Sequence, residues 1–262
     1  MEIFIYLFKK IKLVRNMEIR VGCCGFPGGM KKYFQKFSLV EIQSTFYRLP
    51  QLKTVQKWRE QAPENFEFCV KAFQGISHPT SSPTWRRSGI KDLEKLKGKV
   101  GFLKPTREVF EFWEKTLEIC KILKARVCLI QLPASFKENE ENIRNAEKFF
   151  SKIKRDKVSI ALELRRWSEE GFKNICKKFD LISCVDPFAS KPLWFSSKRI
   201  AYFRLHGSPP GKQMYKYKYT KKDLIKLKKK IENLKKVKEV FILFNNIFML
   251  EDALNFLKLL RK

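Results

Sequence analysis

Polar side chains recur where the strands predicted from this sequence end. They include two carboxylates, Glu41 and Glu163, together with Lys71 and His206. Two carboxylates that share a pocket could form a general acid/base pair, because each changes the proton affinity of the other. Lys71 could form a Schiff base if desolvation lowered its pKa. We predict these four residues as catalytic; the alternative for each glutamate is a salt bridge that only shapes the pocket.

Arg204 and His206 are two residues apart, which places both on one face of a strand. A guanidinium stays charged and binds oxyanions as a fork, whereas an imidazole changes protonation near neutral pH. We therefore predict that Arg204 holds an anionic group of the ligand while His206 moves a proton beside it. The predicted ligand-binding residues are Cys24, Thr45, Tyr47, Gln131, Arg165, Asp186, Arg204, Asn245 and Asn246.

Metal ligation is only weakly indicated. Glu41, Glu163, Asp186 and His206 are suitable ligand types, but one histidine at a strand end is few, and neighbouring cations oppose a divalent metal. We predict no metal site and no cofactor. His78 is predicted to be a surface histidine of a long loop.

The adjacent residues Cys23 and Cys24 are expected to be buried free thiols that point to opposite faces of a strand. A reactive thiol is the alternative if an Arg or Lys nearby lowered its pKa. Only the cysteine whose side chain faces the barrel axis would then be relevant to function.

Alternating strand and helix patterns must position these side chains. The expected strands span residues 18–23, 39–43, 66–71, 127–132, 158–164, 181–185, 200–205 and 240–243, and Glu41, Gln43 and Thr45 share one face by two-residue spacing. Thr106 is predicted to cap one helix, and Thr220 with Asp223 forms a capping box for another.

Eight strands, each followed by a helix or a helix-sized insertion, place the chain in the α/β class. The 262 residues suit a single (β/α)8 barrel of the TIM type with a long loop after strand 3. Catalytic residues of such barrels lie at the C-terminal ends of strands, so the polar strand ends predict one shared pocket. We predict a barrel domain over residues 17–262 and an N-terminal extension over residues 1–16. The loop at residues 73–105 is predicted to be a lid that uses Trp85, Arg86 and Arg87.

The chain is strongly basic, with 56 Lys and Arg against 27 Asp and Glu. Such a surface attracts polyanions, although lysine-rich surfaces also occur throughout whole proteomes. Residues 212–238 contain twelve lysines and two acidic residues, and Tyr215, Tyr217 and Tyr219 alternate with lysine at their start. Basic and aromatic groups in this order suit phosphate contact and base stacking, and a lysine-rich outer helix is the alternative.

The seven cysteines are an odd number and include no CxxC pair, which favours a reducing compartment. The sequence has neither an apolar run long enough to span a membrane nor the charge order of a secretory signal. We therefore predict a cytoplasmic protein with no membrane contact.

Eight motifs occur in order along the chain: GCCGF, VEIQSTFYRLP, FCVKA, QLP, ALELRRW, VDPF, YFRLHG and FNN. In these motifs the chain resembles the YecE-like family, also called domain of unknown function number seventy-two. The resemblance runs from about Ile19 to the C-terminus. It implies a TIM-type barrel and a cytosolic protein, and it implies no reaction.

Together these observations predict a phosphate-containing anionic ligand at the C-terminal face of the barrel. The partner is then a phosphorylated small molecule, and the polar strand ends favour an enzyme that acts on it. The first alternative is a nucleic-acid-binding protein with a role in repair or processing, and the second is a non-catalytic ligand-binding barrel. Salt-dependent retention on DNA or RNA would favour the nucleic acid.

Overall fold

The computed structural model describes residues 11–13 and 17–261. Its strands form one sheet in chain order, and an additional pairing of β2 with β9 closes the order of β2 to β9. The strands are β1 (Ile11–Leu13), β2 (Met17–Cys24), β3 (Leu39–Ile42), β4 (Glu67–Lys71), β5 (Val127–Gln131), β6 (Ser159–Glu163), β7 (Ile182–Val185), β8 (Ile200–Leu205) and β9 (Glu239–Phe244). This closed order confirms the predicted (β/α)8 barrel of the TIM type.

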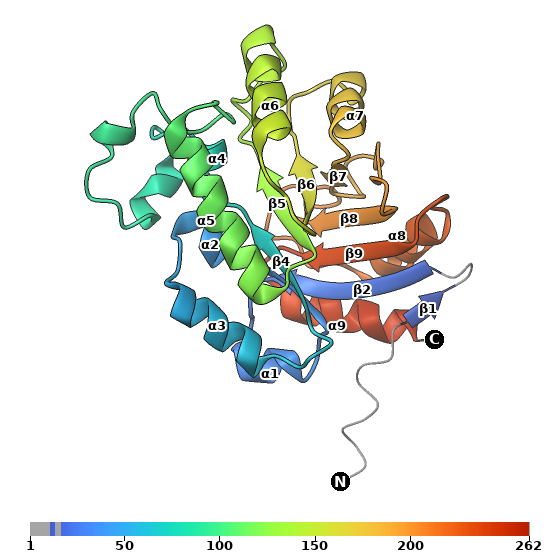
Figure 1. Cartoon of the computed structure of the whole chain (residues 1–262). Coiled ribbons are helices and arrows are strands. Elements are labelled where there is room, and N and C mark those ends of the chain that lie inside the picture. Colours follow the sequence, from blue (N-terminus) through green and yellow to red (C-terminus); the bar gives the residue numbers. More distant parts are fainter. Residues whose placement is uncertain (1–10, 14–16, 262) are drawn as a thin grey trace. The chain divides into compact units, whose positions relative to one another are not determined.

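Helices follow most of these strands, although β7 leads to β8 through residues 186–199 without a helix (Figure 1). They are α1 (Met30–Phe34), α2 (Ser44–Tyr47), α3 (Leu52–Gln61), α4 (Gln74–Ser77), α5 (Arg107–Leu123), α6 (Glu140–Lys152), α7 (Glu169–Lys178), α8 (Lys221–Glu232) and α9 (Met249–Leu260), with 3₁₀ turns η2 (Pro83–Arg87) and η3 (Glu94–Leu96). The predicted caps are confirmed, because Thr106 accepts from the Val109 amide and Thr220 forms both bonds of a capping box with Asp223. Within the described residues, no helix combines the length and apolar character that crossing a membrane requires.

The chain divides into two compact units. The first unit contains residues up to 41, residues 62–67 and residues from 182 onward. In it, β2 pairs in parallel with β9 from Glu18↔Glu239 to Cys23↔Phe244, and β9 pairs in parallel with β8 (Figure 1). Helix α9 contacts β2 and β9 and helps to bury the apolar side chains of these strands.

Part of the predicted N-terminal extension is paired with the first unit. Residues 11–13 form β1, which runs antiparallel to β2 from Ile11↔Ile19 to Leu13↔Met17. The rest of the extension, residues 1–10 and 14–16, lies outside the described residues. The predicted domain boundaries therefore stay predictions.

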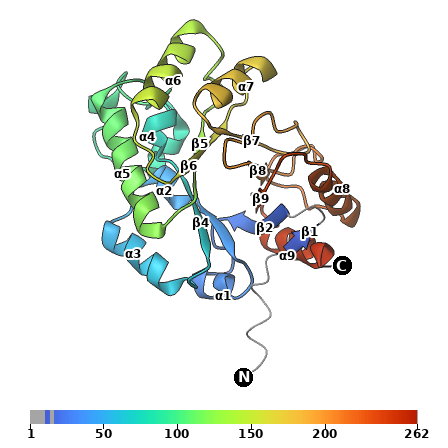
Figure 2. The same cartoon turned by 45° about the vertical axis from the view of Figure 1, so that its right-hand side comes forward.

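The second unit contains residues 42–61 and 68–181. Strands β4, β5 and β6 run in parallel, and the last pair of the β5–β6 register is Gln131↔Glu163. Helix α5 contacts α3, and the two lie side by side in Figure 2. The apolar side chains of α5, among them Trp113 and Leu117, are buried. This packing fixes the strand ends that carry Lys71, Gln131 and Glu163.

One predicted segment differs from the structure. The second expected strand ends at Ile42 rather than at residue 43, and the chain then turns into α2. Thr45 is therefore a helical residue, and the two-residue spacing that grouped it with Glu41 does not apply to it. The long loop predicted at residues 73–105 contains α4, η2 and η3, and its two ends are joined, because Gly101 N donates to Gly75 O at 2.8 Å and Leu103 N donates to Ile76 O at 3.0 Å.

Candidate functional site

Glu41, in β3, is the centre of a buried polar cluster in the first unit. Its Oε1 lies 3.1 Å from a terminal nitrogen of Arg204, and its Oε2 accepts a hydrogen bond of 2.7 Å from the Tyr202 hydroxyl. The Cys24 thiol lies 3.5 Å from the same Oε1. The cluster thus joins the ends of β2 and β3 to the interior-facing side chains of β8. Arg204 neutralises Glu41, as the salt-bridge alternative expected.

His206 continues this cluster beyond the end of β8. Its Nε2 lies 3.3 Å from the second terminal nitrogen of Arg204. Asp186, directly after β7, accepts a hydrogen bond of 2.9 Å from the His206 amide and lies 3.6 Å from the ring Nδ1. The predicted neighbours Arg204, His206 and Asp186 therefore do lie together. In this arrangement the carboxylate of Asp186 holds the His206 backbone through its amide.

The two adjacent cysteines point in different directions, as expected. Cys23 donates to the carbonyl oxygen of Met249 at 3.4 Å, and Cys24 faces Glu41 and Arg204. Burial raises the pKa of Cys23 to about 12. Burial, reinforced by the charge of Glu41, raises the pKa of Cys24 well above its ordinary value despite the opposing effect of Arg204. Both thiols are therefore protonated at neutral pH, and neither has the character of a nucleophile.

Asn246 and the tyrosines after β8 form a structural network. The Asn246 amide donates to Tyr217 O and to Asp252 Oδ2, each at 2.7 Å. Tyr219 is buried, and its hydroxyl accepts from the Gly207 amide at 2.8 Å. Tyr217 donates to Asp223, the capping-box residue of α8, at 2.7 Å. Tyr219 is therefore buried and unavailable for base stacking, whereas base stacking by the partly exposed Tyr217 stays a prediction.

Lys71 ends β4 in the second unit and is 6% exposed. Its ammonium nitrogen lies 4.0 Å from the centre of the Phe46 ring. The hydroxyl of Thr45 lies 2.7 Å from the Lys71 carbonyl oxygen and 3.0 Å from that of Ile42. Thr45 thus braces the strand end, which is a supporting role next to the predicted ligand site.

Glu163 ends β6 beside Gln131, its register partner at the end of β5. Nε and one terminal nitrogen of Arg165 both lie 3.4 Å from Glu163 Oε1. Glu163 is 6% exposed, whereas Arg165 remains exposed to solvent. The pair places one carboxylate and one guanidinium at the same strand end, as predicted.

His78 is a residue of this unit whose position was predicted wrongly. It follows α4 directly and is 7% exposed, so it is a buried rather than a surface histidine. Its ring packs edge-on against Phe46, with the ring centres 4.9 Å apart. Burial, followed by the charges of Lys71 and Arg165, lowers its pKa to about 3. His78 is therefore a neutral imidazole beside two cations.

Residues of the predicted lid are packed within the second unit. Trp85 is 2% exposed, and its Nε1 donates to the His78 carbonyl oxygen at 3.2 Å. Trp85 is thus a core residue of this segment rather than a cover for ligand. Arg87 lies 3.6 Å above the Tyr47 ring, and Gln74 donates to the Tyr47 carbonyl oxygen at 2.9 Å. The opening and closing of the segment stay predictions.

The predicted site residues fall into two sets that follow the two units. The first unit holds Cys24, Glu41, Asp186, Arg204, His206, Asn245 and Asn246, and the second holds Thr45, Tyr47, Lys71, Gln131, Glu163 and Arg165. Asn245 is half-buried and donates its backbone amide to Leu205 O at 2.8 Å. The catalytic and binding roles of all these residues stay predictions. Over the described ranges, no group of three or more His, Cys, Asp or Glu side chains is placed to hold a metal ion.

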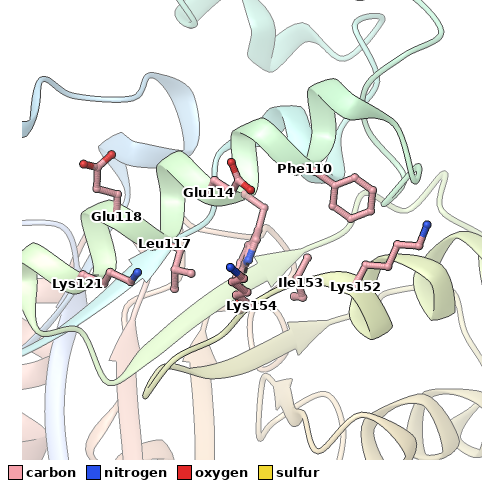
Figure 3. A pocket seen from close by; sticks show the side chains of 9 residues that line it. Phe110, Glu114, Leu117, Glu118, Lys121, Lys152, Ile153 and Lys154 are labelled. Carbon is pink, nitrogen blue, oxygen red and sulfur yellow. Dashed lines mark hydrogen bonds between the residues drawn. The ribbon is translucent and has the colours of Figure 1, made fainter.

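A hollow of about 760 Å³ lies in the second unit, between α5 and the segment that follows α6 (Figure 3). Phe110, Leu117 and Ile153 give it an apolar floor, and charged side chains such as Lys121 and Lys152 surround them. No predicted site residue lines it. Its lysines are therefore suitable controls for Lys71 and Arg165, the cations at the strand ends.

Comparison with known proteins places the chain in a family. The family model described as protein of unknown function DUF72 matches residues 27–262. UPF0759 protein YunF from Bacillus subtilis strain 168 is 25% identical over 244 residues, which cover 83% of this chain and 80% of YunF.

Solved structures share the fold. A DUF72 family protein from Enterococcus faecalis V583 has a TM-score of 0.69 at 23% identity, covering 94% of this chain and 98% of that chain. A D-tagatose 3-epimerase-like protein has a TM-score of 0.56 at 17% identity, covering 92% of this chain and 96% of that chain. Endonuclease IV from Thermus thermophilus has a TM-score of 0.52 at 12% identity, covering 92% of this chain and 97% of that chain. At these identities the likeness shows the barrel fold alone. The match over residues 27–262 contains seven of the eight motifs and confirms the resemblance, and the chain belongs to the DUF72 family.

Proposed function

We propose that this protein binds a phosphate-containing anionic ligand at the C-terminal ends of β4, β5 and β6, and that it is an enzyme acting on that ligand. The observation that carries the proposal is that the Lys71 ammonium and the buried His78 imidazole both pack on the Phe46 ring, and that the charges of Lys71 and Arg165 both lower the pKa of this imidazole. Two cations whose charges act on one enclosed side chain can also attract an anion that binds beside it. Lysine and arginine side chains are the usual partners of phosphate oxygens.

The two cations differ in what they offer a ligand. Lys71 is a compact charge on a nearly enclosed strand end, where attraction to an anion is stronger than in water. Arg165 is exposed, and its contact with Glu163 holds the planar guanidinium at the end of β6. Arg204 is a weaker choice for the same role, because it is 1% exposed and already engages Glu41. The proposal therefore assigns the anion to Lys71 and Arg165.

Glu163 gives this site a carboxylate for proton transfer. It is 6% exposed and lies next to Gln131 in the β5–β6 register. A carboxylate held beside a bound ligand can accept a proton from it, and a partly enclosed position suits that role. The identity of the reaction follows from the ligand, so binding is the first property to measure.

Calorimetric titration tests the binding half of the proposal. Inorganic phosphate, a sugar phosphate and a nucleoside monophosphate are titrated into the wild type and into Lys71→Gln and Arg165→Gln. We expect each substitution to weaken binding about tenfold or more, which is about 1.4 kcal/mol. Lys121→Gln is the matched control, since Lys121 is an exposed lysine of the same unit that pairs with Asp156 at 2.7 Å. Wild-type affinity in both strand-end variants, or no binding by the wild type, would show that the proposal is wrong.

Phosphorus NMR of the bound compound tests the enzymatic half. We expect Glu163→Gln to bind the compound within about threefold of the wild type and to slow its conversion about a hundredfold or more, since general acid–base catalysis contributes roughly that much. Equal conversion rates in the wild type and Glu163→Gln would show that Glu163 takes no part in the reaction.

A second candidate function, nucleic-acid binding, is favoured by one separate observation. Helix α8 carries exposed lysines at Lys221, Lys222, Lys226 and Lys229, within a chain of net charge +29. Filter binding of DNA and RNA at several salt concentrations tests it, because the logarithmic slope reports the number of phosphate contacts. Replacing these four lysines with glutamine should reduce that slope if α8 binds the backbone. Lys71→Gln should leave it unchanged.

A further inference from the structure

His78 presents a single ring nitrogen to solvent from a side chain that is otherwise enclosed. Nδ1 lies 2.8 Å from the hydroxyl oxygen of Ser77. Nε2 has no hydrogen-bond partner among residues 11–13 and 17–261, yet it is not one of the buried polar atoms that lack a partner. Solvent therefore reaches Nε2, although His78 as a whole is only 7% exposed. An imidazole enclosed in this way but open at one nitrogen is suited to contact a ligand.

The Ser77 hydroxyl determines which ring nitrogen carries the proton. Ser77 is 1% exposed, and its hydroxyl has His78 Nδ1 as its hydrogen-bond partner. A buried hydroxyl that only accepted would leave its own proton without a partner, which costs free energy. Ser77 therefore donates to Nδ1. The proton of the neutral imidazole is then on Nε2, so the solvent-facing atom is a hydrogen-bond donor.

The ring has little freedom to turn away. Phe46 packs edge-on against one side, and Trp85 holds the His78 backbone through the carbonyl oxygen. A Cβ atom added at Gly101 would lie 2.4 Å from the His78 carbonyl carbon, so the chain of Gly101 passes directly against this residue. The direction of the Nε2–H bond is thus fixed before any ligand arrives, and a preorganised donor binds without a reorganisation cost.

The charged groups that face His78 are both cations. Lys71 comes from β4 and Arg165 from the segment after β6, where Glu163 contacts Arg165. The Lys71 nitrogen lies 4.0 Å from the centre of the same Phe46 ring that packs on His78. With burial, these charges lower the pKa of His78 to about 3, so the ring carries no charge near neutral pH. The position combines two cations with one neutral donor.

We infer that His78 is a ligand-binding residue that donates a hydrogen bond from Nε2 to a tetrahedral dianion held by Lys71 and Arg165. This inference rests on the proposed function and specifies its ligand: the group bound is a phosphomonoester or another doubly charged tetrahedral oxyanion. Lys71 and Arg165 supply the positive charge that attracts the dianion, and the neutral imidazole satisfies a further oxygen without adding charge.

Sulfate is the probe that isolates the protonation state of His78, because sulfate stays a dianion between about pH 5 and pH 8, the range in which an ordinary histidine titrates. A neutral donor predicts a sulfate Kd that is constant within about twofold over this range. His78→Leu should weaken sulfate binding about tenfold at every pH, and His78→Gln, which keeps an N–H donor, should recover part of the loss. Nitrogen-15 NMR of the wild-type ring should show one neutral tautomer, protonated at Nε2, throughout.

Ser77→Ala separates a ligand contact from a structural role of His78. Without the Ser77 hydroxyl the ring is free to populate both tautomers, so sulfate binding should weaken by about two- to fivefold while the fold is unchanged. A Kd that increases steeply above about pH 6, or wild-type affinity in His78→Leu, would overturn the inference. If Lys71→Gln loses sulfate while His78→Leu keeps it, the proposed function stands and this inference fails. If the wild type binds neither sulfate nor phosphate, both fail.

Discussion

Glu41 and Arg204 form a salt bridge of 3.1 Å in which neither side chain is more than 1% exposed. Removing two charges from water costs free energy, and their attraction offsets this only with good geometry and further hydrogen bonds. Tyr202 supplies such a bond to Glu41 Oε2 at 2.7 Å. The sequence offered a salt bridge as the alternative role of Glu41, and the structure gives that salt bridge Arg204 as its partner.

Breaking this pair should strongly destabilise the protein. Arg204→Met leaves Glu41 as a buried charge without its partner, and we expect the free energy of unfolding to fall by about 3 to 5 kcal/mol. Adding Glu41→Gln to Arg204→Met should recover a large part of that loss, because the uncompensated charge is removed. Urea unfolding measures both changes. The control is Arg107→Met, whose arginine pairs with Glu111 on the exposed face of α5 and should have little effect on stability.

Tyr202→Phe should isolate the contribution of the hydroxyl. The substitution keeps the ring and removes the donor to Glu41, so we expect a loss of about 1 to 3 kcal/mol in the free energy of unfolding. In a double-mutant cycle with Glu41→Gln, the two changes should be clearly non-additive, since the two groups are in direct contact. Additive values would mean that the 2.7 Å contact contributes nothing to stability. Tyr215→Phe, at an exposed tyrosine, is the control.

The sequence predicted the positions of strands well where a buried periodic run is bounded by turn residues. The strand at residues 200–205 was predicted with the bounds that β8 has, and its two-residue spacing correctly placed Arg204 near His206. The same spacing could have identified Tyr202, which precedes Arg204 by two residues on that face. The two-residue periodicity could not show that the chain turns after Ile42. Thr45 in α2 is stabilised by a hydrogen bond from its hydroxyl to the carbonyl oxygen of Lys71, and Lys71 is distant in the sequence.

The salt-bridge partner of Arg204 and the burial of His78 were harder to predict from the sequence, since both depend on tertiary packing. Arg204 could have paired with either glutamate on charge alone, and its contact with Glu41 follows from the strand order β8, β9, β2, β3 of the closed sheet. His78 lies in a polar stretch typical of a surface loop. It is buried because Trp85 and Gly101 pack against its backbone, and no local pattern encodes those contacts.

Gly22→Ala should destabilise the fold through the backbone of β3. A Cβ atom at Gly22 would lie 2.1 Å from the Leu39 carbonyl oxygen, which cannot move without disturbing the strand. We expect a loss of about 3 kcal/mol or more, at the upper end of overpacking effects. Gly98→Ala is the control, because a Cβ there meets nothing within 4 Å and only the positive φ of 74° is penalised. Thermal unfolding of both variants measures the difference, and equal melting temperatures would contradict the close approach.

The pH dependence of stability should report the neutral state of His78. Its pKa is about 3 in the folded protein against an ordinary value of 6.5, so the unfolded chain binds the extra proton first as the pH falls. Stability is therefore lost as the pH decreases from about 6.5 towards 3, and nothing is lost above that range. Between pH 7 and pH 5 the wild type should lose about 2 kcal/mol more than His78→Gln, which has no such proton to bind. Urea unfolding of the two proteins at both pH values measures this difference. Parallel pH profiles would mean that His78 has the same pKa in the folded protein as in the unfolded chain, and burial and the two cations would then not act on it as the structure indicates.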